Sequence, residues 1–276
     1  MKSIALVLCL ASSCLAQDAL KSSLVFHASF DSILNADFSK GDTTAVIKKG
    51  KEFVPCVFND DVKLDATGGK FGGCLHFPKK GVTRPQFSGV NVLGYNDKSW
   101  SATVSVWLRL TPDEDLEPGY CDPVQIVGDD TKKGFIFLEW SKNEAPRFFR
   151  YAIRPLSQIW NPTNVQWDEI PFDKRPMVQI ANAPFRRDVW THAVFTLDRI
   201  NDQAAKPSGS LYLNGQLQGR ITGWDLTFDW KPESVALVLG AAYVGHLDDL
   251  AVFDRALSDD EVKQVFQLER GIASLR

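Results

Sequence analysis

The chain has 276 residues, 44% of them hydrophobic, which is enough to build a folded core, and a formal net charge of −3. This mild acidity and the lack of any lysine or arginine cluster argue against a nucleic-acid partner. Beyond residues 1–16 no segment is long and apolar enough to cross a bilayer, so we predict no transmembrane segment.

Residues 1–16 have the layout of a secretory signal peptide. Lys2 supplies a positive start, an apolar run follows, and Cys14-Leu15-Ala16 ends in a small-x-small cleavage pattern. We therefore predict a protein that is secreted to the extracellular space or the periplasm after removal of residues 1–16. A bacterial lipoprotein is the alternative, although Ala11 stands where the lipoprotein cleavage box usually has leucine.

Residues 17–276 consist of short segments in which apolar residues alternate with others, as in β-strands. Clusters of Gly, Pro, Asn and Asp separate these segments, and no linker or low-complexity stretch interrupts them. We therefore predict a single all-β domain built as a two-sheet antiparallel sandwich. The expected strands are 24–30, 103–110, 135–140, 148–153, 192–197, 210–213, 235–239 and 247–253.

Two local patterns add detail to this sandwich. Asn214-Gly215 joins two β runs and predicts a hairpin, because both turn positions tolerate positive φ. Ser258 and Glu261 form a capping box ahead of an amphipathic run. The sequence therefore predicts one short C-terminal helix.

Three cysteines follow the predicted signal peptide: Cys56, Cys74 and Cys121. Their spacing matches no zinc pattern. In an oxidising compartment we expect a Cys56–Cys74 disulfide, whose loop is long enough to stabilise the fold. Cys121 then either replaces one of the two partners or stays free and buried.

Four segments, in order, resemble a known family: Phe30-Asp31, Gly69–Phe77, Trp190–Val194 and Gly245–Ser258. The last is the most specific, because it is similar to the closing strand and turn of laminin-G-like jelly rolls of the concanavalin A-like lectin/glucanase superfamily. The resemblance covers about residues 24–270 and implies one convex and one concave sheet. This family includes lectins, adhesion modules and polysaccharide-degrading enzymes, so fold alone does not settle function.

The resemblance also implies a calcium site. Period-two alternation puts Asp248 on the same strand face as Leu250 and Val252, which the family places between the sheets, and a buried charge needs compensation. The family often supplies a calcium ion there, and Asp31 matches the position of a second oxygen ligand. We expect a structural Ca²⁺ at Asp31 and Asp248; alternatively, Asp248 caps a turn or pairs with Arg255.

The sequence predicts no catalytic residue. Glycoside hydrolysis needs two carboxylates held a short distance apart. The acidic stretch Asp113–Glu117 lies between prolines and is expected to be a solvated loop, and the four histidines form no cluster. We therefore favour a non-catalytic protein, with a polysaccharide-active hydrolase or lyase as the alternative.

An extended insert at about residues 120–190 is richer in aromatic and cationic side chains than the fold requires. Alternation turns Arg150 and Arg154 toward the open side of their sheet. Trp160 and Trp167 follow in a long loop broken by prolines. Tryptophan rings stack on sugars, and arginine binds carboxylate or sulfate groups, so this insert is the candidate binding region.

Trp107 and Arg109 share one face of their strand and are expected to join the same concave surface. The predicted ligand-binding residues are thus Trp107, Arg109, Arg150, Arg154, Trp160 and Trp167. Alternatively, the two loop tryptophans only pack the loop onto the sandwich. We expect a secreted carbohydrate-binding module for a neutral or acidic glycan, and a cell-surface adhesion protein with a protein partner is the further alternative.

Overall fold

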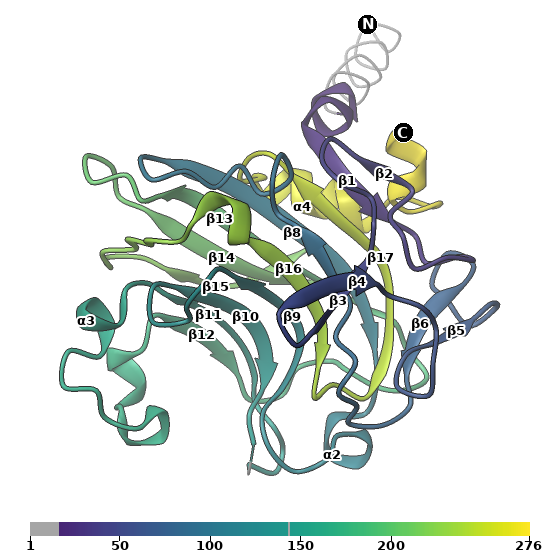
Figure 1. The fold of residues 1–276 in the computed structure, drawn as a ribbon, viewed down its shortest axis with the longest axis horizontal. Coiled ribbons are helices and arrows are strands. Elements are labelled where there is room, and N and C mark those ends of the chain that lie inside the picture. The colour runs from purple at the N-terminus through teal and green to yellow at the C-terminus, as the bar shows by residue number, and fades with distance from the viewer. Residues whose placement is uncertain (1–16, 143) are drawn as a thin grey trace, which may run out of the picture.

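The computed structural model describes residues 17–142 and 144–276, which form two antiparallel sheets packed face to face (Figure 1). The signal-peptide prediction for residues 1–16 lies outside the described residues. One sheet has nine strands: β1 (Leu24–Ala28), β2 (Phe38–Ser39), β5 (Lys63–Asp65), β6 (Cys74–Phe77), β8 (Trp100–Arg109), β13 (Thr191–Ile200), β14 (Ser208–Leu213), β15 (Gln216–Ile221) and β17 (Gly245–Phe253).

The other sheet has eight strands: β3 (Val46–Lys49), β4 (Glu52–Pro55), β7 (Gln86–Ser88), β9 (Cys121–Val127), β10 (Phe135–Trp140), β11 (Phe149–Arg154), β12 (Met177–Ile180) and β16 (Ala236–Ala241). Its order is β12-β11-β10-β9-β16-β7-β3-β4. The nine-stranded sheet runs β15-β14-β13-β8-β17-β1-β2, with β6 paired to β17 and β5 to β6. The predicted two-sheet antiparallel sandwich is confirmed.

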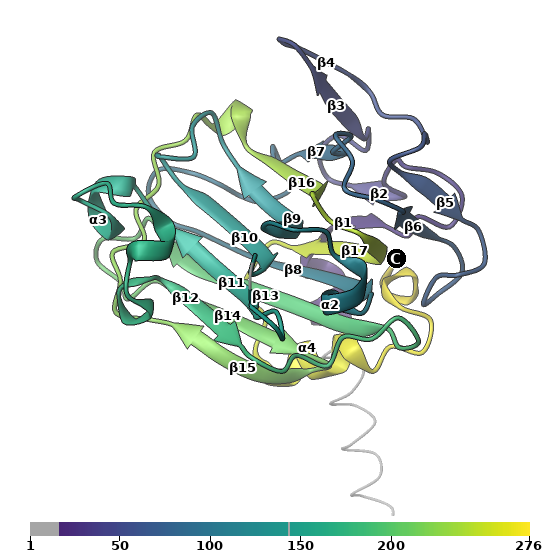
Figure 2. The ribbon, with the colours of Figure 1, turned by 90° about the horizontal axis from the view of Figure 1, so that it is seen from below.

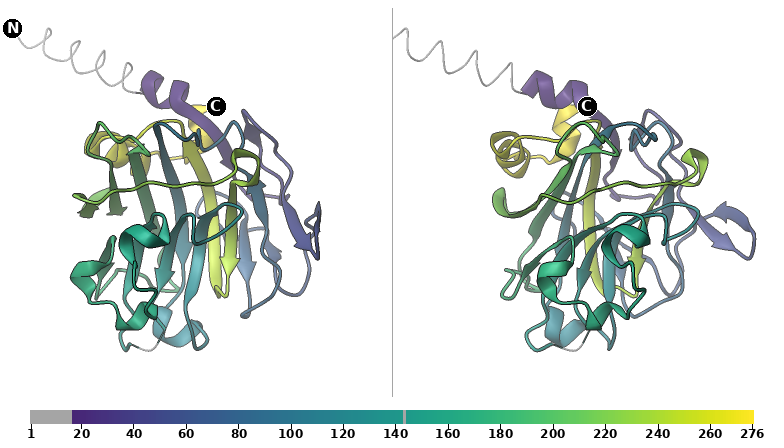
Figure 3. Two further views of the ribbon diagram at one scale, coloured as in Figure 1. Left: turned by 60° about the vertical axis from the view of Figure 1, so that its left-hand side comes forward. Right: turned by 90° about the vertical axis from the view of Figure 1, so that its left-hand side faces the viewer.

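The helices are short: α2 (Pro112–Asp115), α3 (Ser157–Trp160), α4 (Asp259–Phe266), and the 3₁₀ turns η1 (Trp167–Glu169), η2 (Phe172–Lys174), η3 (Pro232–Ser234) and η4 (Ile272–Leu275). Among α2, α3 and α4, α4 alone is long enough to show an amphipathic period, which is why the sequence predicted it and not the other two. Its capping box is confirmed: the backbone N–H of Glu261 donates to the Ser258 hydroxyl, and the N–H of Ser258 donates to the Glu261 carboxylate. Residues 17–23 are also helical, and they lie beside η4 (Figure 3).

Strand alternation places the core between the two sheets. Phe149, Tyr151 and Ile153 of β11 are fully buried in it, as expected, so the residues between them face outward. The Asn214-Gly215 hairpin is also present, with positive φ at both residues, and it joins β14 to β15.

One departure from strict alternation lies in β17. The pairing with β8 shifts between Asp248 and Ala251, and Asp249 has a φ of 50°, so a β-bulge interrupts the strand. Asp248 pairs with Trp107 and therefore faces the outside of the nine-stranded sheet with it. The expectation that Asp248 lies between the sheets beside Leu250 is wrong, because an extra residue in a strand reverses the faces that follow.

Candidate functional site

Three of the predicted binding residues meet on the outer face of the eight-stranded sheet. The guanidinium carbon of Arg154, the last residue of β11, lies 3.7 Å from the ring centroid of Trp167 and 5.1 Å from that of Trp160. It also lies 4.8 Å from the ring of Phe137 on β10. We name Arg154, Phe137, Trp160 and Trp167 the Arg154 aromatic cluster.

The chain builds this cluster with a loop that leaves β11 and folds back over the sheet. Pro155 ends the strand, and α3 and η1 then bring Trp160 and Trp167 together edge to face, with their centroids 5.5 Å apart. Figure 2 shows the segment around α3 at one end of the molecule and the β3–β4 hairpin at the opposite end.

Two N–H donors of the cluster lack an acceptor. The Nε of Arg154 and the indole nitrogen of Trp167 are buried without a hydrogen-bond partner. Burial also lowers the pKa of Arg154 to about 10, and the nearby Glu139 and Asp122 carboxylates counteract this shift. At neutral pH the group is a cation held against aromatic faces. A ligand hydroxyl that reached either donor would satisfy it.

Arg150 lies on the same face but is not available to a ligand. Only 4% of the residue is exposed, because its guanidinium donates to Glu139 at 3.2 Å, to Glu144 at 3.4 Å and to Gln179 at 2.7 Å. Glu139 and Gln179 are its cross-strand neighbours on β10 and β12. The expectation of an exposed Arg150 is wrong, since the strand register provides its partners.

A pair of carboxyl groups that the sequence analysis missed lies next to Arg150. Asp122 of β9 and Glu139 of β10 are both buried, and burial raises the pKa of each well above the ordinary value for a carboxyl group. Asp122 Oδ2 accepts from Gln125, while its Oδ1 has no partner. Charged residues set between core positions of the sheet, such as Glu139 before Trp140, are the signal that could have revealed them.

Trp107 and Arg109 lie on the other side of the molecule, because β8 belongs to the nine-stranded sheet. Trp107 is 4% exposed and stacks on His192 and on Phe266 of α4. Arg109 lies over the ring of Trp190 at 4.9 Å. The expectation that these two residues share a surface with the insert is therefore wrong, and Trp107 serves to pack α4.

Asp31 and Asp248 hold a loop through backbone amides. Asp248 Oδ2 accepts from the N–H groups of Lys70 and Phe71 at 2.6 and 3.1 Å, and its Oδ1 accepts from that of Asp249 at 2.8 Å. Asp31 Oδ1 accepts from the N–H of Gly73 at 2.9 Å.

These amide donors bind both carboxylate oxygens of Asp248 and one of Asp31, and they compensate the buried Asp248 carboxylate as a turn cap does. Within the described residues no three or more His, Cys, Asp and Glu side chains are grouped to hold a metal. Calcium at Asp31 and Asp248 stays a prediction, and this geometry gives it no support.

The expected disulfide is absent. Cys56, Cys74 and Cys121 are all free and buried in the part of the chain that the structure describes. Cys56 follows the edge strand β4 of the eight-stranded sheet, whereas Cys74 begins β6 of the nine-stranded sheet. The two residues are near in sequence, but the chain crosses from one sheet to the other between them.

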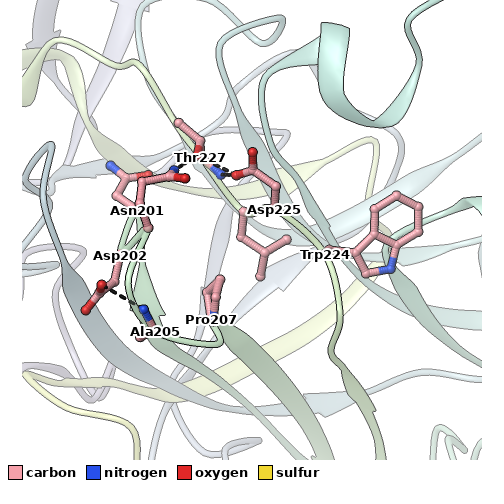
Figure 4. A pocket seen from close by; sticks show the side chains of 9 residues that line it. Asn201, Asp202, Ala205, Pro207, Trp224, Asp225 and Thr227 are labelled. Carbon is pink, nitrogen blue, oxygen red and sulfur yellow. Dashed lines mark hydrogen bonds between the residues drawn. The ribbon is translucent and has the colours of Figure 1, made fainter.

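The hollows outside the Arg154 aromatic cluster include two with different linings. One is a polar pocket beside the turn after β13, where Asp202 and Asp225 cap their own loops by accepting from Ala205 and Thr227 (Figure 4). The other is a groove of about 470 Å³ near the β3–β4 hairpin. We name it the basic groove; its lining residues are Ile47, Lys48, Lys49, Val82, Thr83, Arg84, Gln86, Gln125, Val127 and Val238.

Comparison with known proteins agrees with this architecture. The family model described as the concanavalin A-like lectin/glucanases superfamily matches residues 87–263, more than half of the chain. A search of curated proteins finds no match. No helix among the described residues has the length and apolar character needed to cross a membrane.

Solved structures share the fold at low sequence identity. Domain 4 of AbnA, a GH43 extracellular arabinanase from Geobacillus stearothermophilus in complex with arabinotriose, is 16% identical with a TM-score of 0.51, covering 88% of this chain and 97% of that domain. The botulinum neurotoxin serotype D ligand-binding domain in complex with N-acetylneuraminic acid is 14% identical with a TM-score of 0.58. The match covers 92% of this chain but only 53% of that domain.

Proposed function

The chain belongs to the concanavalin A-like lectin/glucanase superfamily, and on that premise we propose that it is a secreted, non-catalytic glycan-binding protein. Its ligand lies on the outer face of the eight-stranded sheet. The observation that carries the proposal is the convergence of Arg154, Trp160 and Trp167 at one place on this face.

The chemistry of the cluster suits a sugar. Trp160 and Trp167 are each partly exposed, as a ring must be if it is to stack on the apolar face of a pyranose or furanose. The unpartnered donors of Arg154 and Trp167 suit hydroxyl oxygens. The arabinanase domain and the toxin domain were solved with arabinotriose and N-acetylneuraminic acid, respectively, and this supports glycan binding on the shared fold.

Affinity electrophoresis against neutral and acidic polysaccharides tests the proposal. We expect retardation of the parent protein and its loss in the Trp160→Ala/Trp167→Ala variant. Trp190→Ala is the matched control, because Trp190 is also partly exposed but lies beside Arg109 of the nine-stranded sheet. A parent that no glycan retards, or a control that loses binding equally, contradicts the proposal. Thermal unfolding of each variant separates lost binding from lost folding.

One observation favours a second function, polysaccharide cleavage. Asp122 and Glu139 are neighbouring carboxyls with raised pKa values on the outer face of a sheet, which is a property of acid–base pairs. Both are buried, and Glu139 is bound to Arg150, so we place this function second. Reducing-end and unsaturated-product assays on the same polysaccharides test it: activity that Asp122→Asn abolishes would replace the non-catalytic proposal.

A further inference from the structure

We propose that the basic groove binds an anionic group, carboxylate or sulfate, of an acidic oligosaccharide that also reaches the Arg154 aromatic cluster. This inference rests on the proposed glycan binding and names the class of glycan. It involves residues to which the sequence analysis gave no role.

The groove combines an apolar floor with a cationic rim. Val127 of β9 and Val238 of β16 point outward between core residues and form the floor. Lys48 and Lys49 come from the β3–β4 hairpin, and Arg84 comes from the segment before β7. Figure 2 shows that this hairpin projects from the body of the molecule, so the groove lies between the hairpin and the sheet.

The three rim cations have no ion-pair partner in the described part of the chain, and all three are exposed. Some other surface lysines of this acidic chain do have one: Lys40 pairs with Asp254, and Lys133 pairs with Asp129. Three unpaired like charges around one groove repel one another, and a bound anion lowers the electrostatic energy of the rim.

Two carboxyl groups adjoin these cations. Glu52 is the cross-strand partner of Lys49, without a salt bridge to it among the described residues, and the buried Asp122 attracts Arg84. Burial raises the pKa of Asp122, so this carboxyl is partly protonated near neutral pH and offsets little of the positive charge. The rim therefore keeps a net positive charge.

The groove and the aromatic cluster share one continuous face. Gln125 lines the groove and donates to Asp122, and the charge of Asp122 acts on both Arg84 and Arg154. From β3, which carries Lys48 and Lys49, to β11, which carries Arg154, the sheet makes five strand steps, about 24 Å in total. A ligand that touches both sites must therefore be longer than a monosaccharide.

The lining of the groove favours a glycan over other polyanions. Its Gln86 and Gln125 amides suit sugar hydroxyls, whereas the lining contains no aromatic ring on which a nucleobase could stack. Three cations are also few for a nucleic acid, whose binding depends on many phosphate contacts.

The test compares the Lys48→Ala/Lys49→Ala/Arg84→Ala variant with a control variant, Lys21→Ala/Lys98→Ala/Lys132→Ala. The control removes the same charge from exposed lysines outside the groove. The probes are heparin, polygalacturonate, neutral arabinan and a duplex DNA oligonucleotide, each measured by calorimetry in about 0.15 M salt. The full mature chain is used, and circular dichroism checks its folding.

We expect the parent and the control to bind heparin or polygalacturonate, and the groove variant to bind it at least about tenfold more weakly. Equal losses in both variants would show a non-specific charge effect and overturn the proposal, as would equally tight binding of the DNA. Binding of arabinan alone, unchanged in the groove variant, would overturn the acidic-ligand inference but leave glycan binding standing. Binding of no polysaccharide would overturn both.

Discussion

The central carbon of the Arg154 guanidinium lies over the ring of Trp167, 3.7 Å from its centroid, the shortest of the aromatic contacts of Arg154. This contact fastens the loop that carries α3 and η1 to the eight-stranded sheet. Arginine suits it because its planar cation stacks on indole and carries an apolar stem.

We expect Arg154→Met to lower the free energy of unfolding by about 1–2 kcal/mol, because the cation–π contacts are lost while most of the packing stays. Arg154→Lys should recover less than half of this, since lysine lacks the planar group. Urea denaturation measures both variants. Arg187→Met is the control, because Arg187 makes only exposed ion pairs. An equal effect in the control would contradict the role of Arg154.

The buried pair of Arg150 and Glu139 gives a second prediction. Glu139→Leu leaves the buried guanidinium of Arg150 without its nearest carboxylate, and we expect a loss of about 3–5 kcal/mol. Arg150→Met/Glu139→Leu removes both charges and should be less destabilised than Glu139→Leu alone. A double-mutant cycle from denaturation curves measures the coupling. Simple addition of the two single effects would show that the pair does not act as a unit.

The raised pKa of Asp122 predicts how stability depends on pH. The folded chain binds this proton more tightly than the unfolded chain, whose aspartate has a pKa of about 4. The contribution of Asp122 to stability is therefore present below about pH 4 and is lost as the pH rises toward neutral. We expect Asp122→Asn to gain stability relative to the parent between pH 4 and 7. Asp97→Asn, at an exposed aspartate, is the control. If the difference in stability between Asp122→Asn and the parent stays constant across this pH range, the raised pKa of Asp122 is contradicted.

The free cysteines predict the reactivity of the mature chain toward thiol reagents. Burial raises the pKa of the Cys56 and Cys121 thiols to about 11 and that of Cys74 to about 12. Few thiolates exist at pH 8, and none of the three residues is exposed. We expect Ellman's reagent to react slowly with the native protein and to detect three thiols after denaturation. Detection of a single thiol would show that two cysteines form a disulfide.

Calcium binding at Asp31 and Asp248 has a direct test. Backbone amides already donate to both carboxylate oxygens of Asp248 and to Oδ1 of Asp31, so we expect the melting temperature to be the same within about 1 °C in EDTA and in millimolar Ca²⁺. A calcium-dependent rise that Asp248→Asn abolishes would instead establish the ion. Asp130→Asn, in an exposed turn, controls for the change in charge.

The sequence by itself determined the class of fold. Each of the eight predicted strands exists within a few residues of its expected limits, because alternation of apolar residues is a local property of a half-buried strand. The Asn214-Gly215 turn and the Ser258–Glu261 cap were predictable for the same reason: neighbouring residues make those contacts. Very short elements such as α3 were not predicted, because they have too few residues to show a hydrophobic period.

Only the tertiary structure decided which side chains share a site. Arg154 meets Trp160 and Trp167 because the loop folds back over β11, whereas Trp107 lies on the other sheet. The strand order places Asp122 next to Glu139 and Arg84 next to the groove, although these residues are distant in sequence. Local residue patterns determine which side chains of a strand point into the core. Long-range strand pairing and one β-bulge determine which side chains lie next to one another, and a binding site depends on those neighbours.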